Sequence, residues 1–151
     1  MQGQRGKRPR RLSRVNRKEH AVAGTTRFQF TKIRVADVEK EYAFYSAALG
    51  RVERSRYAVE EGEGALEEIL MTSTDGTEQT LVLLHYRHQP VPPTGSVVLG
   101  FLVTGIDDVV RRAEAAGGRV TTEPYDMPEL NIRVAFVEDP EGHLVEFFER
   151  V

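Results

Sequence analysis

The chain has 151 residues, of which 40% are hydrophobic and 29% charged, as expected for one ordinary domain or two small modules sharing a core. The absence of cysteine excludes disulfides, thiolate metal sites and cysteine nucleophiles, and it is compatible with the cytoplasmic location that we expect. No apolar run approaches the roughly 18 residues needed to span a bilayer, and no apolar segment follows the basic N-terminus. We therefore expect neither a membrane partner nor a secretory signal.

The net charge of −2 is unevenly distributed along the chain. Residues 1–26 hold eight Lys or Arg and one Glu, a net charge of +7, whereas residues 27–151 hold 13 basic and 22 acidic residues, a net charge of −9. Residues 1–26 show no apolar periodicity, so we expect a flexible, solvated arm or an over-long start of the reading frame. A nucleic-acid-binding arm and a transit peptide are alternatives, but the arm lacks aromatic residues for stacking on bases and is poor in Ser.

The rest of the chain contains an internal repeat. FTKIRVADVEKEYAFYSAALGRV, residues 30–52, and VLGFLVTGIDDVVRRAEAAGGRV, residues 98–120, align without a gap at an offset of 68 residues. A repeat of this length predicts two copies of one supersecondary unit, neither of which can bury its apolar face alone.

The first copy begins with a strand in which Thr31, Ile33 and Val35 point to one face and Phe30, Lys32 and Arg34 to the other. A helix should follow, with Asp37 as N-cap and Gly50 as a left-handed C-cap. Its expected apolar stripe is Val38, Tyr42, Tyr45 and Leu49. Three strands should complete this unit, at residues 51–58, 65–74 and 77–86, the last two joined by an Asp75-Gly76 turn.

The second copy follows an extended, proline-containing linker at residues 89–95. Its helix is expected at residues 107–116, and its later strands at residues 119–123, 132–138 and 143–150, with a turn at residues 139–142. Residues 125–131 are either a lid or an ordinary connection. The sequence thus predicts an α+β domain at residues 27–151, made of two βαβββ modules at about 27–88 and 96–151.

Two segments carry a family resemblance. IRVADVEKEYAFYSAALG has a strand–Asp–helix–Phe-Tyr–Leu-Gly pattern, and VAFVEDPEGHLVEFFE has an Asp-Pro-x-Gly turn before a strand that bears a Glu. In this order they resemble the vicinal oxygen chelate superfamily, which includes glyoxalase I, bleomycin-resistance proteins and extradiol dioxygenases. The resemblance covers about residues 28–151 and implies a curved mixed sheet that forms a cup, with the helices outside. It does not specify the activity, because the superfamily supports many chemistries.

The metal-dependent members of this superfamily take ligands from the first and last strand of each module, typically His or Gln, Glu or Gln, His, and Glu. The resemblance maps these four positions onto Phe30, Leu83, Val98 and Glu146. Phe, Leu and Val have no lone pair, and a single carboxylate is too few for most catalytic metal sites. We therefore expect no metal or other cofactor in the cup. A divalent metal is the alternative, if Gln29, His85 and Glu146 converge.

The cup implied by the resemblance is largely apolar with a few polar groups, as in most small-molecule sites. The expected ligand-binding residues are Phe30, Lys32, Arg34, Leu83, His85, Val98, Leu144 and Phe148. Arg34 matches an Arg that helps hold the glutathione carboxylate in glyoxalase I enzymes. His85 is alternatively a solvated residue at a strand end, and His143, of opposite parity to Glu146, is expected at the surface.

Glu146 lies within an apolar strand and has two interpretations. In the first, it forms an ion pair with Lys32 or Arg34, or is simply exposed at the mouth of the cup. In the second, it is a polar anchor or a catalytic base in a hydrophobic pocket. Three classes of protein remain open: a metal-free small-molecule-binding protein, a lyase, isomerase or dioxygenase that uses Glu146, and an interaction scaffold. We expect a homodimer, since this superfamily usually covers its sheet edges by pairing chains.

Overall fold

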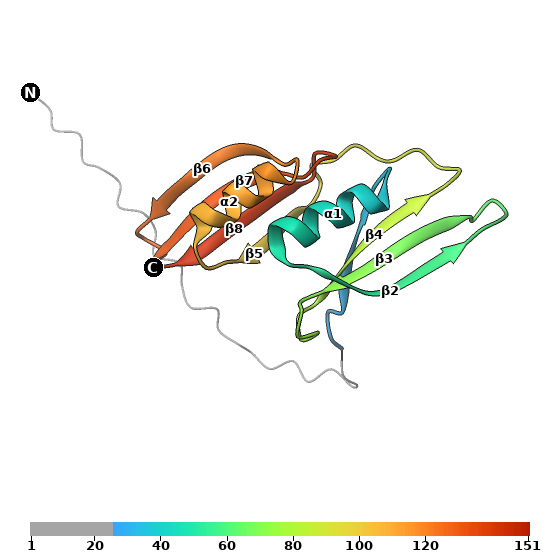
Figure 1. Ribbon diagram of the computed structural model, residues 1–151, viewed down its shortest axis with the longest axis horizontal. Coiled ribbons are helices and arrows are strands. Elements are labelled where there is room, and N and C mark those ends of the chain that lie inside the picture. The colour runs from blue at the N-terminus through green and yellow to red at the C-terminus, as the bar shows by residue number, and fades with distance from the viewer. Residues whose placement is uncertain (1–25) are drawn as a thin grey trace, which may run out of the picture.

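The computed structural model describes residues 26–151, and the predicted βαβββ unit is present twice (Figure 1). The expected arm, residues 1–26, lies outside the described residues except for Thr26. The first module consists of β1 (Phe30–Arg34), α1 (Val38–Leu49), β2 (Val52–Val59), β3 (Leu66–Thr72) and β4 (Thr80–Tyr86). The second consists of β5 (Val98–Leu102), α2 (Ile106–Ala115), β6 (Arg119–Met127), β7 (Ile132–Glu138) and β8 (Leu144–Arg150).

Each module contributes one mixed four-stranded sheet. The strand orders are β1-β4-β3-β2 and β5-β8-β7-β6, with β1 parallel to β4, β5 parallel to β8, and the other pairs antiparallel. The expected α+β class is confirmed. Hydrogen bonding between strands defines two four-stranded sheets, one in each module.

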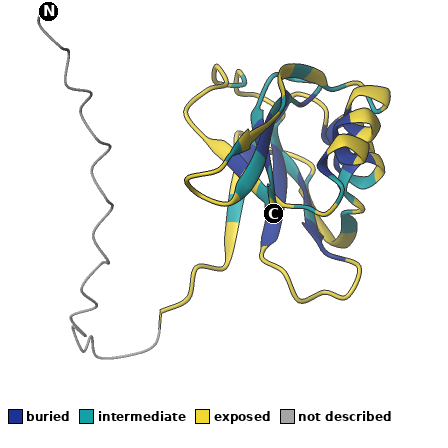
Figure 2. Cartoon of the chain, turned by 90° about the vertical axis from the view of Figure 1, so that its left-hand side faces the viewer, coloured by how far each residue is buried: buried dark blue, intermediate teal, exposed yellow. Residues whose placement is uncertain are grey.

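The two helices pack against each other, and both lie on one side of the sheets (Figure 1). The predicted caps of α1 are confirmed: the Asp37 carboxylate accepts hydrogen bonds from the Glu39 and Lys40 amides, and Gly50 is left-handed with φ 64°. Figure 2 shows the buried residues on the strands and on the side of the helices that faces them. One hydrophobic core includes residues from both modules.

The structure of the second module decides between the two interpretations of residues 125–131, a lid or an ordinary connection. Strand β6 extends to Met127, and Tyr125, Asp126 and Met127 pair with Val134, Arg133 and Ile132 of β7. These residues therefore belong to a hairpin and do not form a lid. Among the described residues, no helix is long and apolar enough to cross a membrane.

Candidate functional site

The face of each sheet opposite the helices, which we call the open face, carries most of the predicted ligand-binding residues. Ile33 of β1 is in the core, so its neighbours Lys32 and Arg34, and Phe30 with them, point to the open face of the first sheet. In the second sheet Leu99, Val145 and Phe147 are in the core. The open face there carries the residues of the other parity, namely Val98, Leu144, Glu146 and Phe148.

The expected orientation of Leu83 and His85 is wrong. Leu83 pairs laterally with Ile33, is fully buried, and belongs to the core on the helix side. His85 has the same parity, and its Nδ1 lies 2.9 Å from the carbonyl oxygen of Val35. The open-face residues of β4 are instead Val82, Leu84 and Tyr86, which pair with Lys32, Arg34 and Leu66.

The two cations of β1 have partners in their own module and, for Arg34, also in the linker. Lys32 Nζ lies 2.5 Å from Oε2 of Glu68 on β3, whose side chain is only 11% exposed. Arg34 stacks over the ring of Tyr86, with 4.6 Å between the guanidinium carbon and the ring centroid, and donates to the carbonyl of Pro90. Glu68 was not anticipated from the sequence, since its own strand, LEEILMT, offers two adjacent acids of opposite parity.

Glu146 does not form an ion pair with Lys32 or Arg34, which was one of the alternatives that the sequence left open. Within residues 26–151, no hydrogen bond or ion pair engages its half-buried carboxylate. Its lateral neighbours are Gly100 on β5 and Phe136 on β7. A Cβ built on Gly100 would meet no atom within 4 Å, so there is open space beside the carboxylate. Glu146 is therefore an uncommitted acceptor on an apolar surface.

The four family ligand positions do not fit a metal ion. Phe30 and Val98 offer no donor, and Leu83 faces the core rather than Glu146. Neither Val82 nor Leu84, the open-face neighbours of Leu83, carries a donor. The alternative set of Gln29, His85 and Glu146 is also disfavoured, because His85 lies on the helix side of its sheet.

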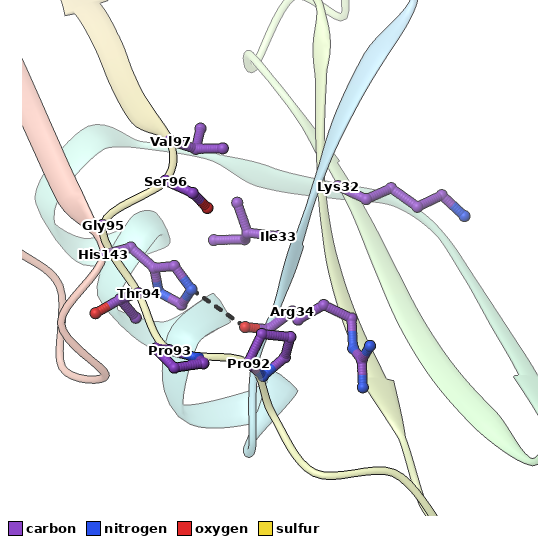
Figure 3. A pocket seen from close by; sticks show the side chains of 10 residues that line it. All are labelled: Lys32, Ile33, Arg34, Pro92, Pro93, Thr94, Gly95, Ser96, Val97 and His143. Carbon is purple, nitrogen blue, oxygen red and sulfur yellow. Dashed lines mark hydrogen bonds between the residues drawn. The ribbon is translucent and has the colours of Figure 1, made fainter.

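Several cavities of the described residues lie where the modules meet, and two of them adjoin β1. One, of about 200 Å³, runs between the edges of the sheets and is lined by Thr31, Gln79, Thr80, Leu81 and Val97–Phe101. The other, of about 140 Å³, lies between β1 and the linker that precedes β5 (Figure 3). Figure 3 shows His143 at its wall, with the Lys32 side chain directed away from it. We call this second cavity the junction cavity.

His143 is not the surface residue expected, because it belongs to a buried polar cluster between the modules. The Tyr45 hydroxyl of α1 donates to Asp139 Oδ2 at 2.8 Å, and His143 Nδ1 lies 3.0 Å from the same oxygen. Glu41 of α1 is fully buried beside them, and neither of its carboxylate oxygens has a hydrogen-bond partner. We call Glu41, Tyr45, Asp139 and His143 the junction cluster.

Burial and mutual contact shift the pKa values of the ionisable groups in the junction cluster. Burial, followed by the negative charge of Asp139, raises the pKa of Glu41 to about 9. Burial alone would lower the pKa of His143, but its hydrogen bond to Asp139 and that residue's charge raise it overall. Burial would raise the pKa of Asp139, yet hydrogen bonds and charge from His143 bring it below its usual value. The Glu41 carboxyl group is therefore predominantly protonated at neutral pH.

Comparison with known proteins places the chain in a family. The family model described as the glyoxalase/bleomycin resistance protein/dioxygenase superfamily matches residues 27–147. The chain belongs to this superfamily. This confirms the resemblance to vicinal oxygen chelate proteins that its two segments carry.

Two relatives and one solved structure give the extent of the similarity. A lactoylglutathione lyase from Haemophilus influenzae is 31% identical over 134 residues, which cover 79% of this chain and 89% of the relative. One from Neisseria meningitidis is 28% identical over 127 residues, covering 82% and 91%. Among solved structures, a glyoxalase family protein from Bacillus cereus matches with a TM-score of 0.74 at 21% identity, covering 87% of this chain and 99% of that one. The structural likeness supports the glyoxalase-like fold.

Proposed function

We propose that this protein binds a small amphipathic molecule on its open faces, with Glu146 as the polar anchor and no metal at the family ligand positions. The observation that carries the proposal is the state of Glu146. Its carboxylate has no partner among the described residues, it is flanked by Gly100, Phe136 and other apolar side chains, and it has open space beside it. Such a carboxylate can accept a hydrogen bond from a ligand hydroxyl or amine while the surrounding apolar surface covers the rest of the molecule.

The charges nearby define the ligand further. Lys32 and Arg34 are held by Glu68, Tyr86 and Pro90, so they are less available to an anionic ligand than the sequence suggested. In the second sheet the open face presents Glu146 and, at the end of the same strand, the exposed Arg150. The Glu146 carboxylate favours a ligand group that donates a hydrogen bond, such as a hydroxyl or an amine.

A second copy of the chain is part of the same proposal. Phe30, Val98 and Leu102 on the open faces are 47%, 49% and 55% exposed. Exposed apolar side chains beside free strand edges are commonly covered by association of chains. A homodimer would cover these side chains and enclose a ligand between apolar walls.

A lyase is the second candidate function, because the Haemophilus and Neisseria relatives are lactoylglutathione lyases by name. In this case Glu146 would act as a base on the open face, since the other three family positions carry no donor. Formation or breakdown of lactoylglutathione by the purified protein, abolished in Glu146→Gln, would support this function over binding alone.

The proposal is tested by a thermal-shift screen of small molecules against wild type, Glu146→Gln and the exposed control Glu129→Gln. The expected hit stabilises wild type and the control more than Glu146→Gln. A hit that stabilises all three equally would remove Glu146 from recognition. Elemental analysis of protein purified without chelator accompanies the screen: a stoichiometric metal that is lost in Glu146→Ala would overturn the metal-free open face.

A further inference from the structure

We propose that Glu41, Asp139 and His143 form a divalent-cation site at the junction of the two modules, separate from the open faces. Glu41 comes from α1 of the first module, whereas Asp139 and His143 flank the turn between β7 and β8 of the second. One donor atom from each lies within 4.8 Å of the other two. The separation of 3.0 Å between His143 Nδ1 and Asp139 Oδ2 is the spacing of two neighbouring ligands bound at about 2.1 Å to one ion.

The histidine is oriented as a metal ligand. Its Nε2 lies 3.1 Å from the carbonyl oxygen of Arg34, which can only accept, so Nε2 carries a hydrogen and donates (Figure 3). Nδ1 faces the Asp139 carboxylate, which also accepts, so in the metal-free protein Nδ1 carries a hydrogen too, and a bound ion would take the place of that hydrogen. Metal-binding histidines commonly donate their second ring N–H to a backbone carbonyl in this way, which fixes the tautomer and the ring orientation.

Glu41 is the independent observation that points to a ligand. It is fully buried, and neither of its oxygens accepts a hydrogen bond from a donor of the described residues, although its own proton, when present, is shared with Asp139. The one hydroxyl of the cluster, that of Tyr45, is already donated to Asp139. A buried carboxylate is costly unless it is paired, protonated or bound to a metal. A cation held jointly with Asp139 and His143 would neutralise it, whereas a proton does so in the metal-free protein.

Access and ligand type narrow the choice of ion. His143, whose side chain is 12% exposed, lines the junction cavity, so an ion can reach the cluster from that side. One imidazole nitrogen with two carboxylates suits a first-row divalent ion such as Zn²⁺ or Mn²⁺, while Mg²⁺ and Ca²⁺ prefer sites made of oxygen alone. Bound there, the ion would tie α1 of the first module to the β7–β8 turn of the second.

Zinc titration of chelator-treated full-length protein, followed by calorimetry, tests the site. Wild type and Glu146→Gln should each bind one equivalent of Zn²⁺. In Glu41→Gln the affinity should fall about 100-fold, since loss of a supporting contact alone typically costs 10–100-fold. Glu41→Gln preserves the size of the side chain and offers Asp139 an amide donor, and circular dichroism checks that it folds. An exposed control, His88→Asn, should bind as wild type.

Three results would overturn the proposal: no zinc binding by wild type, equal binding by Glu41→Gln, or loss of binding in His88→Asn. The experiment is also independent of the proposed function. Binding that is lost in Glu146→Gln but kept in Glu41→Gln would place the ion on the open face and contradict both proposals. Loss in Glu41→Gln alone would leave the metal-free open face intact.

Discussion

Gly118, between α2 and β6, is the position where one added methyl group should test the packing of the two modules. A Cβ there would lie 2.8 Å from Cε2 of Phe44 on α1, 2.9 Å from the carbonyl oxygen of Ala113, and 2.9 Å from Cγ1 of Val137. Phe44 and Val137 are both buried, so neither ring nor methyl has free space to move into.

The expected cost of Gly118→Ala follows from these three contacts. Adding one methyl group to a packed core lowers the free energy of unfolding by about 1–3 kcal/mol. Because one of the three contacts is a backbone oxygen, which cannot move as a side chain can, we expect a loss of about 3 kcal/mol at this site. Reduced freedom of the unfolded chain returns up to about 1 kcal/mol when Gly becomes Ala. We therefore expect a net loss of about 2 kcal/mol in the free energy of unfolding, or roughly 4–8 °C in Tm.

Urea unfolding of Gly118→Ala measures this loss, with Gly100→Ala as the matched control. A Cβ at Gly100 meets no atom within 4 Å, and its backbone does not require a positive φ, so the control should stay within about 0.5 kcal/mol of wild type. A Gly118→Ala variant as stable as the control would refute the described close approach of Phe44 on α1 to Gly118.

The remaining predictions concern polar contacts and assembly. Tyr45→Phe removes the hydroxyl that donates to buried Asp139 and should cost about 1–2 kcal/mol by urea unfolding; an unchanged midpoint would contradict the hydrogen bond. Lys32→Met should cost about 1 kcal/mol, because it leaves Glu68 unpaired at a partly exposed site, and adding Glu68→Gln should recover most of the loss. Light scattering at micromolar concentration should give the mass of a dimer, and a monomeric mass would reject the proposed assembly.

The sequence predicted the two modules, but it did not predict which residues of β4 lie on the open face. The reason is the composition of this strand. The strand TLVLLHY is apolar on both faces: Leu81 and Leu83 are buried on the helix side, while Val82 and Leu84 are buried on the open face. A period of two cannot be read from a strand without polar alternation. The gapless family match then selected Leu83, one position from the residues that face outward.

Glu41 and His143 were missed for a different reason. Glu41 lies three residues after Val38 and four before Tyr45, so it occupies the buried stripe of α1, a signal that helical spacing could have given. Its environment, however, depends on Asp139, 98 residues away. His143 was assigned to the surface because its parity opposes that of Glu146, but in a sheet with helices on one side that parity faces the interior.

The turn that precedes β8 also determines where Glu146 lies relative to β1. The Ala36 and Asp37 amides, at the connection between β1 and α1, donate to the Glu141 carboxylate at 2.7 and 2.8 Å. The Nε2 of His143 donates a hydrogen bond to the carbonyl oxygen of Arg34, the last residue of β1. His143 immediately precedes β8, and three residues later this strand presents Glu146 on the open face. The turn fixes the end of β1 and the start of β8 relative to each other. A substitution in the junction cluster should therefore shift the open-face residues of these two strands, although the cluster lies outside the open face.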